Sequence, residues 1–131
     1  MISKCYLVEP FFCNEDDPIA EVAKKLKDYK QRHIYVVDKT QRPIGFISIT
    51  DILDKIVIPA KNVALMKAKD IMCKNILVFD DNHSVQMAYK AMTEKSIASC
   101  AIVDVETGGK MIGILNLQEA IRYVTDPSNI G

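Results

Sequence analysis

An internal repeat constrains the fold of this 131-residue chain more than any other feature of its sequence. Apolar residues at helical spacing begin at Ile19 and return from Val85, an offset of 66 residues. The tripeptide Val-Val-Asp that ends at Asp38 returns at the same offset as Ile-Val-Asp. Gly45 returns as Gly113 two residues later, and the shift falls in a glycine-bearing turn, where insertions cost little. The chain is therefore expected to contain two copies of one structural unit.

The pattern of apolar and turn residues in each copy predicts the element order β-α-β-β-α. In the first copy we expect an extended segment, a helix and two strands at Pro10–Cys13, about Pro18–Lys30, Ile34–Val37 and Ile44–Ser48. In the second copy the same elements are expected at Ile76–Phe79, about Ser84–Lys95, Cys100–Val105 and Met111–Leu115. A closing helix follows each hairpin, near Ile52 and near Leu117. Asp17 and Ser84 are expected to cap the two long helices.

The size of one copy limits how it can be stable. A unit of this length buries too little surface for a stable core of its own. We therefore expect the copies, residues 1–60 and 61–131, to pack through their sheets about a pseudo-twofold axis. The predicted fold class is α+β, one compact body with two related clefts between its halves.

Composition excludes several classes of protein. The 17 basic and 17 acidic residues cancel, which argues against broad attachment to nucleic acid or membrane. No apolar run approaches a membrane span and no signal peptide is recognisable, so the expected location is cytoplasmic. The four cysteines form no CxxC pair, which argues against a metal site and for buried free thiols in a reducing compartment; they are Cys5, Cys13, Cys73 and Cys100.

The stretch from Arg32 to Leu53 carries the candidate chemistry. Two side chains that can be positively charged, Arg32 and His33, precede the first strand of the hairpin. Ser48 ends its second strand, and Thr50 and Asp51 follow. Hydroxyls and a carboxylate can hold a ribose, and a basic pair can hold its phosphate.

These residues carry a resemblance to a known family. Val-Val-Asp before a short turn, followed by Gly-h-h-Ser-x-Thr-Asp (h, apolar) leading into a helix, resembles the cystathionine-β-synthase (CBS) domain. The second copy is similar through Asp70-Ile71-Met72, the strand Ile76–Phe79, and Ile102-Val103-Asp104 before Gly113. The likeness covers roughly residues 6–125, as a tandem pair also called a Bateman module.

The resemblance implies a regulatory module without catalytic activity or cofactor, which binds an adenosine-containing ligand. AMP, ADP or ATP would be the usual ligand, with S-adenosylmethionine or another adenosyl compound as an alternative. It also implies a homodimer and an unidentified protein target. By the family pattern, Asp51 holds the ribose, and Arg32 and His33 hold phosphate. Ser48 and Thr50 would donate to phosphate oxygens, helped by a helix that begins near Ile52.

The resemblance places the adenine against apolar residues of the other copy. The predicted adenine contacts are Asn75, Ile76, Leu77, Val78, Ile97 and Ala98. Local roles explain the other site residues equally well, and both interpretations stay open. Asp51 can act as a helix N-cap, the hydroxyls can satisfy nearby backbone, and cations suit the end of a helix.

The second copy departs from the family pattern. Asn116, Gln118 and Glu119 stand where the first copy has Ser48, Thr50 and Asp51, and Ala98-Ser99 stand where it has the basic pair. We therefore expect a weaker second cleft, built on Asn116 and Glu119, that is empty or takes an uncharged nucleoside.

Three other functions compete with nucleotide sensing. The departures in the second copy suit a structural pairing module that binds no ligand. A small enzyme could use His33 and Asp51 as base and orienting group, but no nucleophile elbow or phosphate-binding glycine loop is present. Nucleic-acid binding is disfavoured because the charge is balanced and no basic, aromatic face is recognisable.

Overall fold

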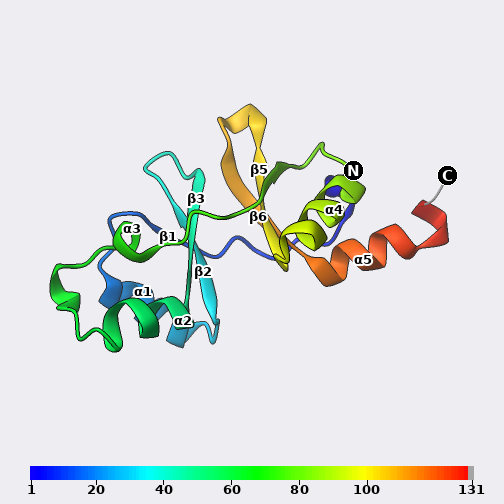
Figure 1. Cartoon of the computed structure of the whole chain (residues 1–131). Helices are drawn as coiled ribbons and strands as arrows, with labels where there is room; N and C mark the ends of the chain where they lie inside the picture. The colour runs from blue at the N-terminus through cyan, green and yellow to red at the C-terminus, as the bar shows by residue number, and fades with distance from the viewer. Residues whose placement is uncertain (130–131) are drawn as a thin grey trace. The chain divides into compact units, whose positions relative to one another are not determined.

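The computed structural model describes residues 1–129, which form two compact units, each with a three-stranded sheet (Figure 1). The Asp51 unit is Phe11–Asn75. The Glu119 unit combines Met1–Pro10 with the chain from Ile76 onward. The predicted domains, residues 1–60 and 61–131, follow the sequence repeat instead, and residues 130 and 131 lie outside the described part of the chain.

The Asp51 unit places one long helix against a mixed sheet. Its elements are β1 (Phe12–Asn14), α1 (Ile19–Asp28), β2 (His33–Val37), β3 (Pro43–Ser48), α2 (Ile49–Ile52), a π-helix (Leu53–Val57) and α3 (Ala68–Ile71). β1 runs parallel to β2 because α1 forms the crossover between them, and β2 and β3 form an antiparallel hairpin. Apolar residues of α1 fill the core against β2 and β3; the core side chains from these three elements are Ile19, Val22, Leu26, Ile34, Val36 and Ile47.

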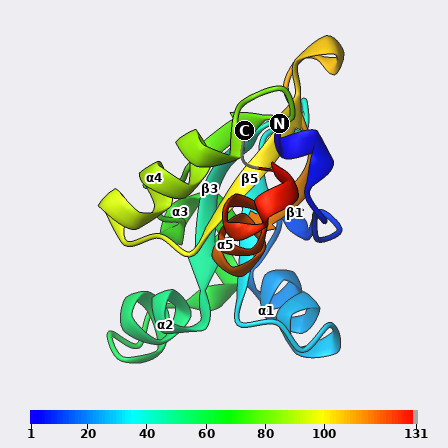
Figure 2. The ribbon, with the colours of Figure 1, turned by 90° about the vertical axis from the view of Figure 1, so that its right-hand side faces the viewer.

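The Glu119 unit repeats this topology. Its elements are β4 (Val78–Asp80), α4 (Val85–Lys95), β5 (Ser99–Asp104), β6 (Lys110–Asn116) and α5 (Leu117–Thr125). The sheet order is β4-β5-β6, again with a parallel pair and an antiparallel hairpin. Figure 2 shows the same elements from a view turned by 90°. The predicted α+β class and the repeated β-α-β-β-α order are confirmed.

The first ten residues belong to the core of the Glu119 unit. A 3-10 helix at Ile2–Lys4 buries Ile2 completely, in the same core cluster as Met92 and Leu115. The backbone N–H groups of Ile2 and Ser3 each donate to a carbonyl of the β4–α4 turn at 2.9 Å. Sequence periodicity gave no sign of this segment, because three residues are too few to show a period.

The two long helices end in the same way. Lys30 and Ser96 both have a positive φ of 54° and stand 66 residues apart, as the repeat requires. The next residue in each case donates its N–H back to the helix, Gln31 to the Leu26 carbonyl and Ile97 to that of Met92, both at 2.9 Å. Both ends therefore adopt a left-handed C-terminal cap without the usual glycine.

The predicted caps and closing helix are corrected in part. Ser84 caps α4 as expected, since its hydroxyl accepts from the Met87 N–H. Asp17 does not cap α1, because its carboxylate accepts from the Asn14 N–H in the preceding turn. The closing helix begins at Ile49, directly after β3, and not near Ile52.

The cysteines are free thiols, and three of the four are buried. Burial raises the pKa of the Cys13 and Cys100 thiols to about 12. The expected burial of Cys73 is wrong, since this residue is exposed in the chain that follows α3. Within residues 1–129 we find no group of three potential metal ligands, and no helix there is both long and apolar enough to cross a bilayer.

Candidate functional site

The β2–β3 hairpin brings the predicted basic pair beside the predicted hydroxyl–carboxylate cluster. His33, the first residue of β2, pairs in register with Ser48, the last residue of β3. The Ile49 N–H donates to the Arg32 carbonyl at 2.9 Å. Arg32 and His33 are both exposed. One end of the hairpin thus presents two exposed basic residues next to the start of α2.

Asp51 is held in place by a reciprocal pair of hydrogen bonds. Its Oδ2 accepts from the Ser48 N–H at 2.9 Å, and its own N–H donates to Ser48 Oγ at 3.0 Å. The N-cap residue is therefore Ser48, and Asp51 occupies the third helical position. The interpretation of Asp51 as the N-cap is wrong, because the side chain that accepts from a free N–H of the first turn is that of Ser48, and the N–H is that of Asp51 itself.

This capping box leaves hydrogen-bonding capacity for a ligand. A carboxylate has about four acceptor positions, and Asp51 uses one for Ser48, while Lys55 Nζ lies 3.4 Å from Oδ1. The Ser48 hydroxyl accepts within the box, so its own hydrogen can still be donated. Thr50 is exposed on the first turn of α2. Asp51 itself is 22% exposed, enough for a polar ligand to reach it.

The Glu119 unit has the same backbone arrangement with different side chains. Ser99 pairs with Asn116, and the Leu117 N–H donates to the Ala98 carbonyl at 2.8 Å. Ala98 and Ser99 thus stand where Arg32 and His33 stand in the Asp51 unit. Asn116 is the N-cap of α5 but makes no side-chain capping bond. This position offers no cation for a phosphate.

Glu119 is bonded much more completely than Asp51. Its two oxygens accept from Arg122 Nε at 2.6 Å and Nη2 at 2.8 Å, and Oε2 also accepts from the Tyr6 N–H at 2.7 Å. The Arg122 guanidinium lies over the Tyr6 ring, 5.1 Å from its centroid. The hydrogen bonds from Arg122 hold the pKa of Glu119 below its usual value, and Glu119 raises the pKa of Arg122. The carboxylate is only 13% exposed.

Sequence reasoning missed three partners of these carboxylates. Lys55 and Arg122 lie four and three residues after their carboxylates, the spacing at which opposite charges meet on a helix, so both could have been found. The contact of Tyr6 could not have been found, because its N–H donates to Glu119 and the two residues are 113 positions apart in the sequence.

The predicted adenine-contacting residues are placed within their own units. Asn75 is exposed at the end of the Asp51 unit. Leu77 belongs to the core of the Glu119 unit, and Ile97 packs against that core. Of the remaining three residues, Ile76 is half-buried, and Val78 and Ala98 are exposed. Their contact with adenine stays a prediction.

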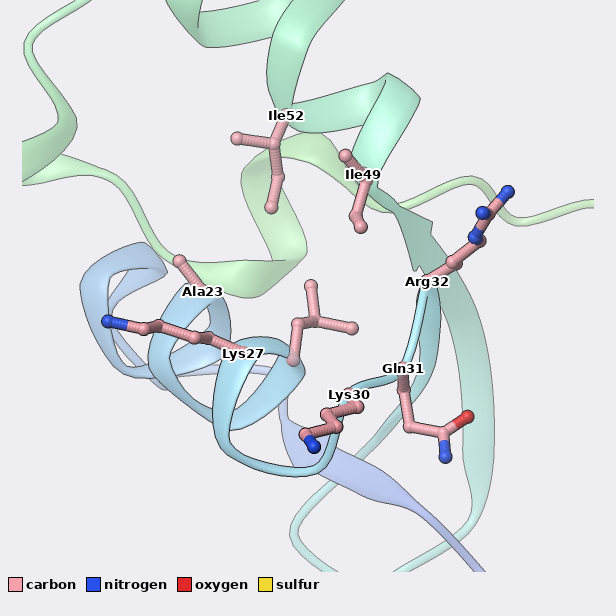
Figure 3. Close-up of a pocket in the computed structure, with 8 residues that line it drawn as sticks. Ala23, Lys27, Lys30, Gln31, Arg32, Ile49 and Ile52 are labelled. Atoms are coloured by element: carbon pink, nitrogen blue, oxygen red, sulfur yellow. The ribbon is translucent and has the colours of Figure 1, made fainter.

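A groove of about 480 Å³ lies between α1 and α2 of the Asp51 unit (Figure 3). Its apolar lining comes from both helices: Ala23, Leu26, Ile49 and Ile52. Its polar lining comes from the last turn of α1 and the residues after it: Lys27, Lys30, Gln31 and Arg32. In Figure 3 the two isoleucines of α2 point towards α1. Sequence analysis assigned only Arg32 of these residues to a site.

Comparison of the sequence with models of protein families identifies the family of the chain. The model of the CBS domain matches residues 4–58 and again residues 68–126. The chain belongs to the CBS domain family. It is a tandem CBS pair, as the resemblance of its motifs predicted.

Relatives of this CBS pair extend beyond the region that they share with it. An uncharacterized protein of Methanopyrus kandleri is 31% identical over 102 residues, which are 78% of this chain and 51% of the relative. An uncharacterized protein of Methanocaldococcus jannaschii is 25% identical over 114 residues, 87% of this chain and 26% of the relative. The chain thus spans about half of the first relative and a quarter of the second.

Solved CBS structures share the fold. The CBS domain protein PAE2072 from Pyrobaculum aerophilum, complexed with AMP, has a TM-score of 0.73 and 20% identity. The similarity covers 98% of this chain and 94% of that one. At this identity the likeness shows the fold alone, and the AMP is a property of that protein.

Proposed function

We propose that this CBS pair is a regulatory module that binds an adenosine-containing ligand, AMP, ADP or ATP, at the Asp51 motif. One observation carries the proposal. The hairpin register sets His33 opposite Ser48 and joins Arg32 to the start of α2, so basic, hydroxyl and carboxylate groups occur together. The AMP complex of a protein with the same fold supports the choice of ligand class.

Each group has a chemical role in the proposed site. Asp51 accepts from the two ribose hydroxyls, and these charge-assisted bonds are worth about 1.5–3 kcal/mol each. Arg32 and His33 neutralise the phosphate. Ser48 and Thr50 donate hydroxyl hydrogens to phosphate oxygens. Ligand binding then shifts the population of protein conformations, and this shift is the signal.

Thermal unfolding with added ligand tests the proposal. A ligand that binds only the folded state must stabilise it, so AMP, ADP or ATP at millimolar concentration should raise the Tm. Arg32→Ala should remove most of the rise, whereas Arg42→Ala, in the exposed turn before β3, should keep it. S-adenosylmethionine in the same series tests the alternative ligand. The proposal is wrong if no adenosine ligand raises the Tm.

A module that binds no ligand and only pairs with a second copy is the other candidate. The internal bonding of Glu119 favours it, because that motif is satisfied without a ligand. Light scattering distinguishes the two functions. A dimer that forms equally with and without nucleotide, in a protein that nucleotide does not stabilise, would favour the structural role.

A further inference from the structure

We propose that Arg122 closes the Glu119 motif, Asn116 to Glu119, to adenosine-containing ligands, and that removing its side chain opens a site there for an uncharged nucleoside. This rests on the proposed function in one respect, because the ribose-binding role of the motif carboxylate is taken from it. Arg122 is then the residue that decides how many ligands one chain can hold.

The Glu119 carboxylate has too few free acceptor positions to hold a ribose. A carboxylate offers about four such positions. Glu119 uses three of them, two for Arg122 Nε and Nη2 and one for the Tyr6 N–H. A ribose needs two, one for each of its vicinal hydroxyls. The position that remains is on Oε1, so a ribose can bind only if an existing bond is broken.

Arg122 is the partner whose loss frees the carboxylate. It supplies two of the three hydrogen bonds, whereas the third comes from the backbone of Tyr6 and survives any change of side chain in α5. Without the guanidinium, the number of free acceptor positions rises from about one to about three. That is enough for both hydroxyls of a ribose.

The contacts of Arg122 keep this closure in place. Its fork matches both carboxylate oxygens at 2.6 and 2.8 Å, and bidentate pairs are the exposed ion pairs that contribute most. The guanidinium also lies over the Tyr6 ring, which holds it from the other side. The hydrogen bonds from Arg122 lower the pKa of Glu119, so the carboxylate stays charged, and the pair intact, at neutral pH.

The Asp51 motif has no residue that could close it in this way. Asp54 stands 68 residues before Arg122, at the corresponding position of the repeat, and its carboxylate repels that of Asp51. The Asp51 side chain is 22% exposed, compared with 13% for Glu119. The two motifs therefore share a backbone and differ in whether an arginine three residues later covers the carboxylate.

Adenosine binding measured by calorimetry tests the closure. Adenosine is the probe because Ala98 and Ser99 offer no cation for a phosphate. Asp51→Asn weakens the first motif, so that a new site stands out. In this background Arg122→Ala should raise the affinity for adenosine by about tenfold or more, because two acceptor positions become free. Further change of Glu119→Gln should abolish the gain.

Three controls separate the opened site from other effects of the change. Lys110→Ala removes a cation from an exposed position of the same unit and should create no site. Arg122→Lys keeps the charge but loses the fork, so it should give an intermediate gain. 2′,3′-Dideoxyadenosine lacks both ribose hydroxyls and should not bind the opened site.

The reciprocal change tests the same relationship in the other unit. Asp54→Arg, in the otherwise unchanged protein, puts an arginine three residues after Asp51. Closure predicts that AMP binding at the Asp51 motif weakens by up to about fivefold, the strength of an exposed ion pair. A cation that acted only through its charge would strengthen the binding of the anionic AMP instead.

Two results would overturn the closure while leaving the Asp51 site intact. The first is a wild-type chain that binds two adenosine ligands. The second is an Arg122→Ala variant that loses stability in urea, shows a folded spectrum by circular dichroism and gains no adenosine site, since the ion pair would then only stabilise α5. Failure of the proposed function looks different, because the wild type would bind no adenosine ligand. A gain in Arg122→Ala that depends on Glu119 would uphold the closure even then.

Discussion

Arg122 and Glu119 form a bidentate ion pair. Asp51, at the corresponding position of the other motif, has a single ion-pair contact, 3.4 Å from its Oδ1 to Lys55 Nζ. One cause of the difference is a substitution between the two copies of the repeat. The residue that corresponds to Arg122 is Asp54, which cannot pair with Asp51. The repeat has therefore kept one carboxylate accessible and bonded the other internally.

The two motifs should respond differently to loss of their carboxylate charge. Asp51→Asn keeps an oxygen that can accept from the Ser48 N–H but loses the charge, so adenosine-ligand affinity should fall by about tenfold or more. Glu119→Gln should leave the affinity of the Asp51 motif unchanged. Isothermal titration calorimetry measures both and should give one site per chain. Equal losses in the two variants would contradict the predicted asymmetry.

The Glu119 ion pair should make stability depend on pH in the acid range. The folded-state pKa of Glu119 lies below the ordinary value of 4.5. Its contribution to the free energy of unfolding is therefore complete above pH 4.5 and is lost as the pH falls through the lower folded value. The stability difference between the wild type and Glu119→Gln, from urea unfolding, should shrink below that pH.

A second variant separates the ion pair from other effects on this pH dependence. Arg122→Ala removes the main cause of the lowered pKa and should flatten the dependence. A difference between wild type and Glu119→Gln that stays constant from pH 7 to pH 3 would contradict the assignment.

Glycine at the ends of the long helices should stabilise the protein. Lys30 and Ser96 have left-handed backbone conformations, which cost an L-residue about 1 kcal/mol more than glycine. Lys30→Gly and Ser96→Gly should each raise the free energy of unfolding by about 0.5–1 kcal/mol. Lys27→Gly, inside α1, should lower it by about 1 kcal/mol. Destabilisation by all three changes would show that the caps are not strained.

Truncation of Ile2 should be as costly as truncation in the middle of a core. Its side chain is completely buried, so Ile2→Ala should lower the free energy of unfolding by about 2–4 kcal/mol. Ile58→Ala, at a side chain that is 69% exposed, should cost below about 0.5 kcal/mol. Chemical unfolding of the two variants gives the comparison. Similar small losses would show that the first residues do not belong to the core.

The repeat made most of the fold predictable. Its offset, 66 residues before the hairpin turn and 68 after it, located both hairpins and both long helices, because strand and helix periods are local properties of the sequence. It also identified Arg32 and His33 with Ala98 and Ser99, a correspondence that the strand registers reproduce. Ser84 was a predictable cap because it stands directly before an apolar helical pattern.

The errors arose where two local signals competed or where a contact spans the chain. Asp17 and Asp51 both looked like caps, but each carboxylate bonds to a backbone N–H three residues earlier. The bond between Tyr6 and Glu119 joins residues that no periodicity connects. The groove between α1 and α2 also depends on tertiary packing, since its two walls are separate in the sequence.

The chain enters the Glu119 unit, leaves it at Pro10 and returns at Ile76, and this path has a consequence for synthesis. The ribosome releases Phe11–Asn75 as one uninterrupted stretch, so the Asp51 unit can fold while the rest is still being made. Met1–Pro10, although made before that stretch, must wait for the strands and helices from Ile76 onward, which emerge after it. Ile2 therefore stays outside its core until Met92 and Leu115 have been made, and moving these ten residues to a position after α5 would remove the delay.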